Sequence, residues 1–157
     1  MTFDELIQII AAFVASLCFA VLFNIRGKKM IAAAFGGLLS WGVFILLKFI
    51  TANEPIRYFA VAVLISFYAE IMARVLKTPT TTFHMTGLVP LIPGGSLYYT
   101  MKAALEGNPQ GFFQKAIKTM ELAVALALGI VITTAFTKIV VNLIMYIKQK
   151  KQTMQKS

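Results

Sequence analysis

The sequence predicts an all-α integral membrane protein, a helical bundle of about five transmembrane helices whose fourth is broken at a Pro-x-x-Pro-Gly-Gly segment. Of the 157 residues, 59% are hydrophobic and only 13% are charged, whereas soluble domains are about 45–50% apolar and about 25% charged. The apolar residues also fall into stretches close to the roughly 20 residues that a helix needs to cross a bilayer. This composition argues against a soluble globular enzyme and against a disordered chain.

The first two apolar stretches cover residues 6–25 and 30–48 and are joined by a short basic turn. Asp4 and Glu5 precede the first stretch where a secretory signal peptide carries positive charge, and no small-residue cleavage site follows, so we expect a retained span. The second stretch contains small residues that suit close helix contact. They are Ala32, Ala33, Ala34, Gly36, Gly37 and Ser40.

The third and fourth stretches cover residues 56–76 and 80–101. The fourth contains the segment Pro90–Gly95, in which two prolines remove backbone donors and disturb the preceding turn. Two glycines in the same segment permit backbone conformations that other residues avoid. We therefore expect the helical hydrogen-bond ladder to be interrupted there, within the membrane and away from lipid.

The last part of the chain predicts an interfacial helix over about residues 110–120 and a final span over 121–147. In the interfacial segment, aromatic and aliphatic side chains can face lipid while Lys115 and Lys118 face water. Lys138 interrupts the final span, and we expect it to be buried against protein or a cavity, or to mark a displaced end of the span. The whole chain, residues 1–157, is then a single transmembrane domain.

The basic residues predict the orientation, because Lys and Arg in loops favour the cytoplasmic side. With five spans, nine of them fall on one side and five on the other. The larger set is Arg26, Lys28, Lys29, Arg74, Lys77, Lys148, Lys150, Lys151 and Lys156, and the smaller set is Lys48, Arg57, Lys102, Lys115 and Lys118. We therefore expect the N-terminus outside and the C-terminus inside. The net charge of +9 then reflects orientation, with no nucleic-acid partner.

The broken fourth helix offers a candidate substrate site. A half-helix that begins near Gly95 presents free N–H groups and a positive dipole end that suit a carboxylate, and transporters use broken helices in this way. An equally weighted alternative is a simple loop or a kink that fits two helices together. The candidate substrate-binding residues are Pro93, Gly94, Gly95, Ser96 and Tyr98.

Three ionisable residues are candidates for proton coupling. Glu70 and Arg74 lie four residues apart, on one face of the third helix, and ionisable groups inside a membrane usually mark a pathway or a proton relay. The alternative is an ion pair that only anchors the helix end. His84, the only histidine, exchanges protons near physiological pH, but a hydrogen-bonded interface residue is the more ordinary interpretation.

Other polar residues give weaker indications. Thr133, Thr134 and Thr137 either line a cavity or bond to helix carbonyls, and we favour the second. Cys18 is the only cysteine, which precludes a disulfide framework or a cysteine-based zinc site. The sequence contains no phosphate-binding loop, metal-ligand cluster or nucleophile–base motif. We therefore expect no enzyme activity, no catalytic residue, no metal and no cofactor.

The segment Val89–Tyr98, with Phe23-Asn24, Glu70–Arg74 and Lys77–Pro79 upstream, resembles the bacterial threonine/serine exporter family, specifically its small-subunit type. The resemblance covers residues 18–105, and the last third of the chain is similar only in hydropathy. It implies proton-driven export of threonine and serine, or of a dicarboxylate such as succinate, across the bacterial cytoplasmic membrane. It also implies a separate larger subunit as partner. A non-transporting subunit that scaffolds a partner protein is the alternative.

Overall fold

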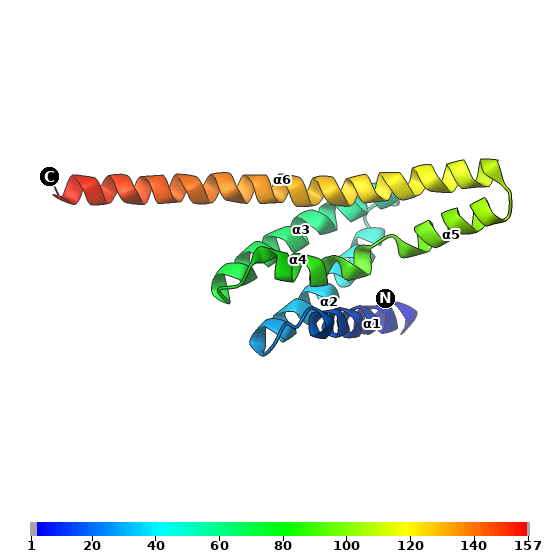
Figure 1. Cartoon of the computed structure of the whole chain (residues 1–157), viewed down its shortest axis with the longest axis horizontal. Coiled ribbons are helices and arrows are strands. Elements are labelled where there is room, and N and C mark those ends of the chain that lie inside the picture. The colour runs from blue at the N-terminus through cyan, green and yellow to red at the C-terminus, as the bar shows by residue number, and fades with distance from the viewer. Residues whose placement is uncertain (1–2, 157) are drawn as a thin grey trace.

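The structure, a computed structural model, describes residues 3–156, apart from the side chains of residues 144 and 148–156. All regular elements in that range are helices (Figure 1), which confirms the all-α class. Their bounds are α1 Phe3–Leu22, α2 Lys28–Lys48, α3 Glu54–Val75, α4 Thr80–Leu88, the short 3-10 helix η1 Val89–Leu91, α5 Gly94–Leu105 and α6 Pro109–Lys156. In this range α1, α2, α3 and the residues 109–147 of α6 are long and apolar enough to cross a membrane.

Helices α1 to α4 form an antiparallel bundle in which α2 packs against α1, α3 and α4 (Figure 1). Helix α6 packs along α3, and its N-terminal part packs against α5. The N-terminus lies at one end of the bundle, and α6 leaves the bundle at the other end.

Helix ends follow from the local sequence. Asn53 caps α3 with its side chain, which accepts a hydrogen bond from the Ile56 amide, and Pro55 stands at the second helical position, where no helix hydrogen bond needs its N–H. Asn24 and Lys77 end α1 and α3 in the left-handed region, with φ of 56° and 48°, a conformation that commonly closes a helix. The two turns lie at the same end of the bundle because α1 and α3 run in the same direction (Figure 1).

Small residues set the distance between helices. A Cβ atom at Gly37 would overlap the Ser16 hydroxyl of α1, and one at Gly129 would lie 2.7 Å from the Ala62 Cβ and 2.9 Å from the Phe59 carbonyl oxygen of α3. Such close backbone approach is typical of membrane helices, where packing rather than the hydrophobic effect holds helices together. The small residues expected in the second span thus serve more than one contact: Gly37 faces α1, whereas a Cβ at Gly36 would lie 3.1 Å from the Tyr68 ring of α3.

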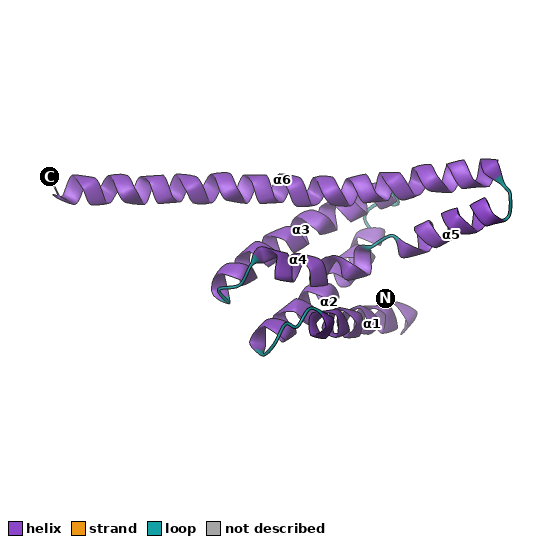
Figure 2. Cartoon of the chain, in the orientation of Figure 1, coloured by secondary structure: helices purple, strands orange, loops and turns teal. Residues whose placement is uncertain are grey.

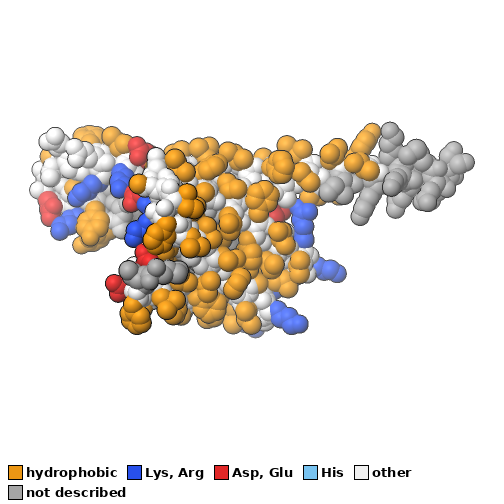
Figure 3. All heavy atoms as spheres, turned by 180° about the vertical axis from the view of Figure 1, so that it is seen from behind, with side chains coloured by type: hydrophobic (Ala, Val, Ile, Leu, Met, Phe, Trp, Pro, Cys, Tyr) orange, Lys and Arg blue, Asp and Glu red, His pale blue; other side chains and the backbone are white. Residues whose placement is uncertain are grey.

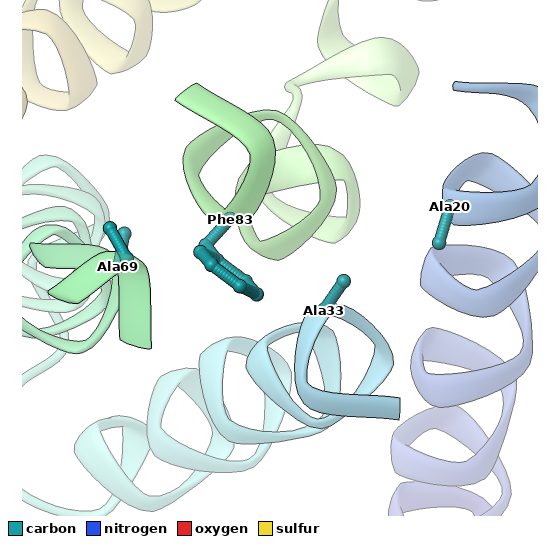
Figure 4. Close-up of a cluster of buried hydrophobic side chains, with 5 residues drawn as sticks. Ala20, Ala33, Ala69 and Phe83 are labelled. Carbon is teal, nitrogen blue, oxygen red and sulfur yellow. The ribbon is translucent and has the colours of Figure 1, made fainter. Parts of the chain in front are cut away.

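A buried cluster joins the four helices at the end where α6 leaves the bundle. It contains Ala20 of α1, Ala33 of α2, Ala69 and Ala73 of α3, and Phe83 of α4 (Figure 4). The phenylalanine ring is the only large side chain among them and is fully buried, so it fills the space that the four alanines leave. The outer surface of the bundle is dominated by hydrophobic side chains, with charged ones gathered at both ends (Figure 3), as a bilayer environment requires.

The fourth stretch is broken, as predicted. Helix α4 ends at Leu88, η1 continues to Leu91, and α5 begins at Gly94 after a short connection (Figure 2). Neither Gly94 nor Gly95 has a positive φ, and both are exposed on the surface of the chain.

The interfacial helix and the final span expected as separate segments form one continuous helix, α6. Pro109 is the first residue of this helix, a position where the backbone N–H makes no helix hydrogen bond and proline's lack of one has no cost. The Asn108 side chain accepts a hydrogen bond from the Gly111 amide at 2.9 Å. No proline follows within the helix, so nothing breaks it at residue 120. Its 48 residues extend for about 72 Å, more than twice the roughly 30 Å hydrocarbon core. Part of α6 therefore lies outside the membrane.

The close contact between α3 and α6 yields a stability prediction. Gly129→Ala should destabilise the chain by about 1–3 kcal/mol, because the new methyl group meets backbone atoms of α3 that have no room to move. Thermal unfolding of the purified protein in detergent measures this change. Gly42→Ala is the matched control, since nothing lies within 4 Å of a Cβ at that position. Equal stability of Gly129→Ala and the wild type would contradict this packing.

Candidate functional site

The Glu70–Arg74 pair lies near the end of α3. An Arg74 nitrogen, Nη2, lies 3.3 Å from the Glu70 Oε2 oxygen, and the Glu70 side chain is 14% exposed whereas that of Arg74 is 53% exposed. The four-residue spacing brings the two side chains together as predicted. The carboxylate is thus the enclosed member of the pair, and the guanidinium is its more accessible partner.

The same carboxylate lines a cavity of about 170 Å³ between α3 and α6. Its walls include Phe67 and Phe136, whose rings meet edge to face with centroids 6.4 Å apart, and it is lined by Phe67, Glu70, Ile71, Arg74, Phe136, Thr137 and Val140. Glu70 therefore pairs with Arg74, as the ion-pair interpretation predicts. It also faces a cavity, as the proton-coupling interpretation predicts.

His84 of α4 lies close to this pair. The Glu70 carboxylate acts electrostatically on its ring, and the Ser66 backbone lies near it. Its Nε2 atom is buried without a hydrogen-bond partner among the described residues. The ring also borders a second cavity, of about 400 Å³, between α4 and α6. Helices α3, α4 and α6 thus bring Glu70, Arg74 and His84 into one polar region within an apolar bundle.

Sequence reasoning missed Ser66 and underrated Thr133, whose hydroxyls are buried without a partner among the described residues. Ala62 of α3 lies against Gly129 of α6, so Ser66 and Thr133, one turn further along each helix, share the same contact. The sequence did contain an indication of this placement. Ser66 precedes Glu70 by four residues and Thr133 precedes Thr137 by four, a spacing that puts each pair on one face of its helix.

Thr137 and Lys138 of α6 differ in their surroundings: Thr137 is half-buried and Lys138 is exposed. The Thr137 hydroxyl donates to the Thr133 carbonyl at 2.8 Å, which confirms the carbonyl-bonding interpretation for Thr137. Lys138 is exposed on α6, so the chain itself does not bury it, and of the two alternatives the displaced end of the span stays a prediction. Lysine can reach the membrane surface with its long side chain from such a position, and burial against protein is not needed.

The broken helix lies nearer the opposite end of the bundle. Its η1 segment packs against α1 and α2 and borders a cavity of about 350 Å³ with Gln8 and Trp41, two residues joined by a 3.3 Å hydrogen bond. The first turn of α5 has no side-chain cap. The α5 start is exposed at Gly94, Gly95 and Tyr98, while Pro93 and Ser96 are half-buried.

The predicted residues therefore form two separate groups. One group surrounds Glu70 near the end of α3, and the other surrounds the start of α5, with no hydrogen bond or ion pair between them among the described residues. Within residues 3–156, no group of three or more His, Cys, Asp or Glu side chains is arranged to hold a metal ion.

Comparison with known proteins assigns the family. No curated protein and no solved structure matches the chain. A family model described as threonine/serine exporter ThrE matches residues 8–136, which include the broken helix, the Glu70 region and the part of α6 that packs on α3. This match covers most of the chain, and the helices carry the apolar surface that a membrane exporter requires. The chain belongs to the threonine/serine exporter family.

Proposed function

We propose that the chain is the membrane subunit of a proton-coupled exporter of small amino acids such as threonine and serine, or of dicarboxylates such as succinate. It works with a larger partner subunit in the bacterial cytoplasmic membrane. The observation that carries this proposal is the Glu70–Arg74 pair beside a cavity between α3 and α6. Ionisable groups in membrane helices are costly, and those that face a cavity are functional-site candidates.

The pair provides two charge states. With Glu70 ionised, Arg74 is neutralised within α3. With Glu70 protonated, the guanidinium is free to attract another anion, such as a carboxylate. A proton and an anionic substrate group that passes Arg74 on its way along the path then act on the same equilibrium, which is the requirement for coupling between them. His84 lies within range of Glu70 and gives the proton a second acceptor.

The start of α5 provides the substrate site in this proposal. Pro93 precedes the helix, Gly94 and Gly95 place no side chain over its first turn, and Ser96 and Tyr98 supply hydroxyls. The Gly94 amide donates to the Ile92 carbonyl at 2.6 Å, so the amides that follow it are the ones offered to a ligand. Nothing lies within 4 Å of a Cβ at either glycine, so a substrate carboxylate can approach the backbone closely. Because broken backbone is tolerated in hydrocarbon only against protein or water, the exposed break supports a partner subunit that covers it.

The orientation follows from the charged ends. The turns after α1 and α3 carry Arg26, Lys28, Lys29 and Lys77, and this end is the cytoplasmic one by the positive-inside rule. The N-terminus then faces outside and the C-terminus inside. The Glu70 group lies toward the cytoplasm, and the broken helix toward the outer face.

Changing Glu70 tests the coupling role. We expect Glu70→Gln, which keeps the side-chain shape but cannot exchange a proton, to retain substrate exchange and to lose accumulation against a gradient. The measurement compares pH-gradient-driven transport with exchange of labelled serine, threonine and succinate in proteoliposomes that contain both subunits.

The control for this variant is Glu106→Gln. Glu106 also forms an ion pair four residues away, with Lys102 at 3.7 Å, but that pair is exposed on α5. Its loss should leave both transport modes unchanged. Normal gradient-driven transport by Glu70→Gln would rule out the coupling role and leave the anchoring ion pair of a scaffolding subunit.

Changing Gly95 tests the substrate site. We expect Gly95→Val to insert and fold normally, because the position has open space around it, and to lose exchange, because the side chain blocks the approach to the α5 amides. Gly42→Val, which also enters open space, controls for a bulky residue in a membrane helix. Undiminished exchange by Gly95→Val, at wild-type expression, would remove the α5 start from the substrate path.

A further inference from the structure

One end of the bundle carries basic side chains that no acid neutralises. Among the described residues, Lys48, Arg57, Lys102 and Lys118 at the opposite end each form an ion pair with a glutamate. The basic residues of the α1–α2 and α3–α4 turns form none with any described acid. These are Arg26, Lys28, Lys29 and Lys77. The positive charge at this end is therefore available to an anion from outside the chain.

A cleft of about 560 Å³ lies between these two turns. The α1–α2 turn contributes Asn24, Arg26 and Lys29 to its lining, and the α3–α4 turn contributes Thr78 and Thr82. Lys29 is half-buried and lines the cleft. Figure 3 shows Lys and Arg side chains gathered at the end of the bundle from which α6 projects.

The positions of these polar groups are fixed by the fold. Asn24 adopts a left-handed conformation, with φ of 56°, and its side-chain oxygen accepts a 2.9 Å hydrogen bond from Arg26 Nε. This bond holds the guanidinium while its two terminal nitrogens have no partner among the described residues. Across the cleft, the Thr78 hydroxyl donates to the Leu76 carbonyl at 3.0 Å, so its proton is used within the turn and the donors available to an anion are the cations of Arg26 and Lys29.

Two helix starts add to the positive potential. Helices α2 and α4 both begin at this end, at Lys28 and Thr80, and neither has a side-chain cap on its first amides. Lys29 and Thr82, from the first turns of these helices, line the cleft. Free N–H groups and the positive ends of two helix dipoles therefore accompany the two cations.

The occupant must combine an anionic group with apolar chains. The cleft lies at the end of membrane helices, and the exposed side chains next to it include Phe23, 52% exposed, and Leu22, 75% exposed. We propose that this cleft binds the phosphate group of an anionic phospholipid, with its acyl chains against these apolar residues. Basic pockets between membrane helices bind such headgroups. This assignment does not depend on the proposed transport activity.

A bound headgroup would join the two halves of the bundle. The buried cluster of Ala20, Ala33, Ala69, Ala73 and Phe83 lies next to the cleft, with Ile25, Met30 and Leu76 packed against it. A phosphate held by both turns neutralises their mutual repulsion and bridges α1–α2 to α3–α4. The lipid is then expected to raise the stability of the chain as well as to bind it.

The test uses the purified full chain in a zwitterionic detergent, with lipid binding measured by native mass spectrometry and stability by thermal unfolding. The probes are phosphatidylglycerol, phosphatidylcholine and inorganic phosphate. We expect phosphatidylglycerol to be retained by the chain and to raise its unfolding temperature. Increasing the salt concentration should weaken this stabilisation. Phosphatidylcholine and inorganic phosphate should have little effect. Arg26→Gln/Lys29→Gln should lower the affinity for phosphatidylglycerol by about tenfold or more.

Lys102→Gln/Lys115→Gln is the matched control, because it removes the same net charge from the opposite end and should keep the wild-type affinity. Equal losses in both double variants would overturn the site in favour of net-charge attraction. Stabilisation by inorganic phosphate equal to that by phosphatidylglycerol would overturn the lipid assignment. If Arg26→Gln/Lys29→Gln does not fold, the wild type alone decides, since equal retention of phosphatidylcholine and phosphatidylglycerol contradicts the proposal.

Discussion

The hydrocarbon core of a bilayer offers no hydrogen bonds, and this constraint explains most of the structure. Every backbone group at that depth must be satisfied by the chain or by another protein, which is why all regular elements of residues 3–156 are helices. The same constraint makes the exceptions informative. The break between α4 and α5 leaves backbone groups exposed, and the Glu70 region leaves buried hydroxyl and imidazole atoms without partners among the described residues.

Close helix contact follows from the same constraint. Without a hydrophobic driving force between helices, packing must be tight, so small residues such as Gly37 and Gly129 stand where backbones meet. Serine and threonine fit these contacts but bring hydroxyls with them. Ser40 satisfies its hydroxyl on the Gly37 carbonyl at 2.9 Å, whereas Ser16, Ser66 and Thr133 find no such partner among the described residues. Two of these three hydroxyls, those of Ser66 and Thr133, belong to α3 and α6, the helices that enclose the cavity beside Glu70.

Much of the fold was predictable because apolar length and proline position act locally. The first three spans and the break at Pro90–Gly95 were expected from the sequence and are present. The continuity of α6 was not predicted from the sequence. The mixed polarity around residues 110–120 is typical of an interfacial helix, but it is equally compatible with the start of a long helix outside the membrane. The four-residue spacing of Glu70 and Arg74 predicted their pairing, while the proximity of His84 and Ser66 depends on packing between helices, which a single sequence does not encode locally.

The central claim is that Glu70 changes its protonation state during transport. Infrared difference spectroscopy measures this directly, in proteoliposomes with both subunits, as the carboxyl C=O band that appears or disappears when substrate is added. The account predicts a band in the wild type that is absent in Glu70→Gln and present in Glu106→Gln. The same difference band in Glu70→Gln, or no carboxyl change in the wild type, would contradict it.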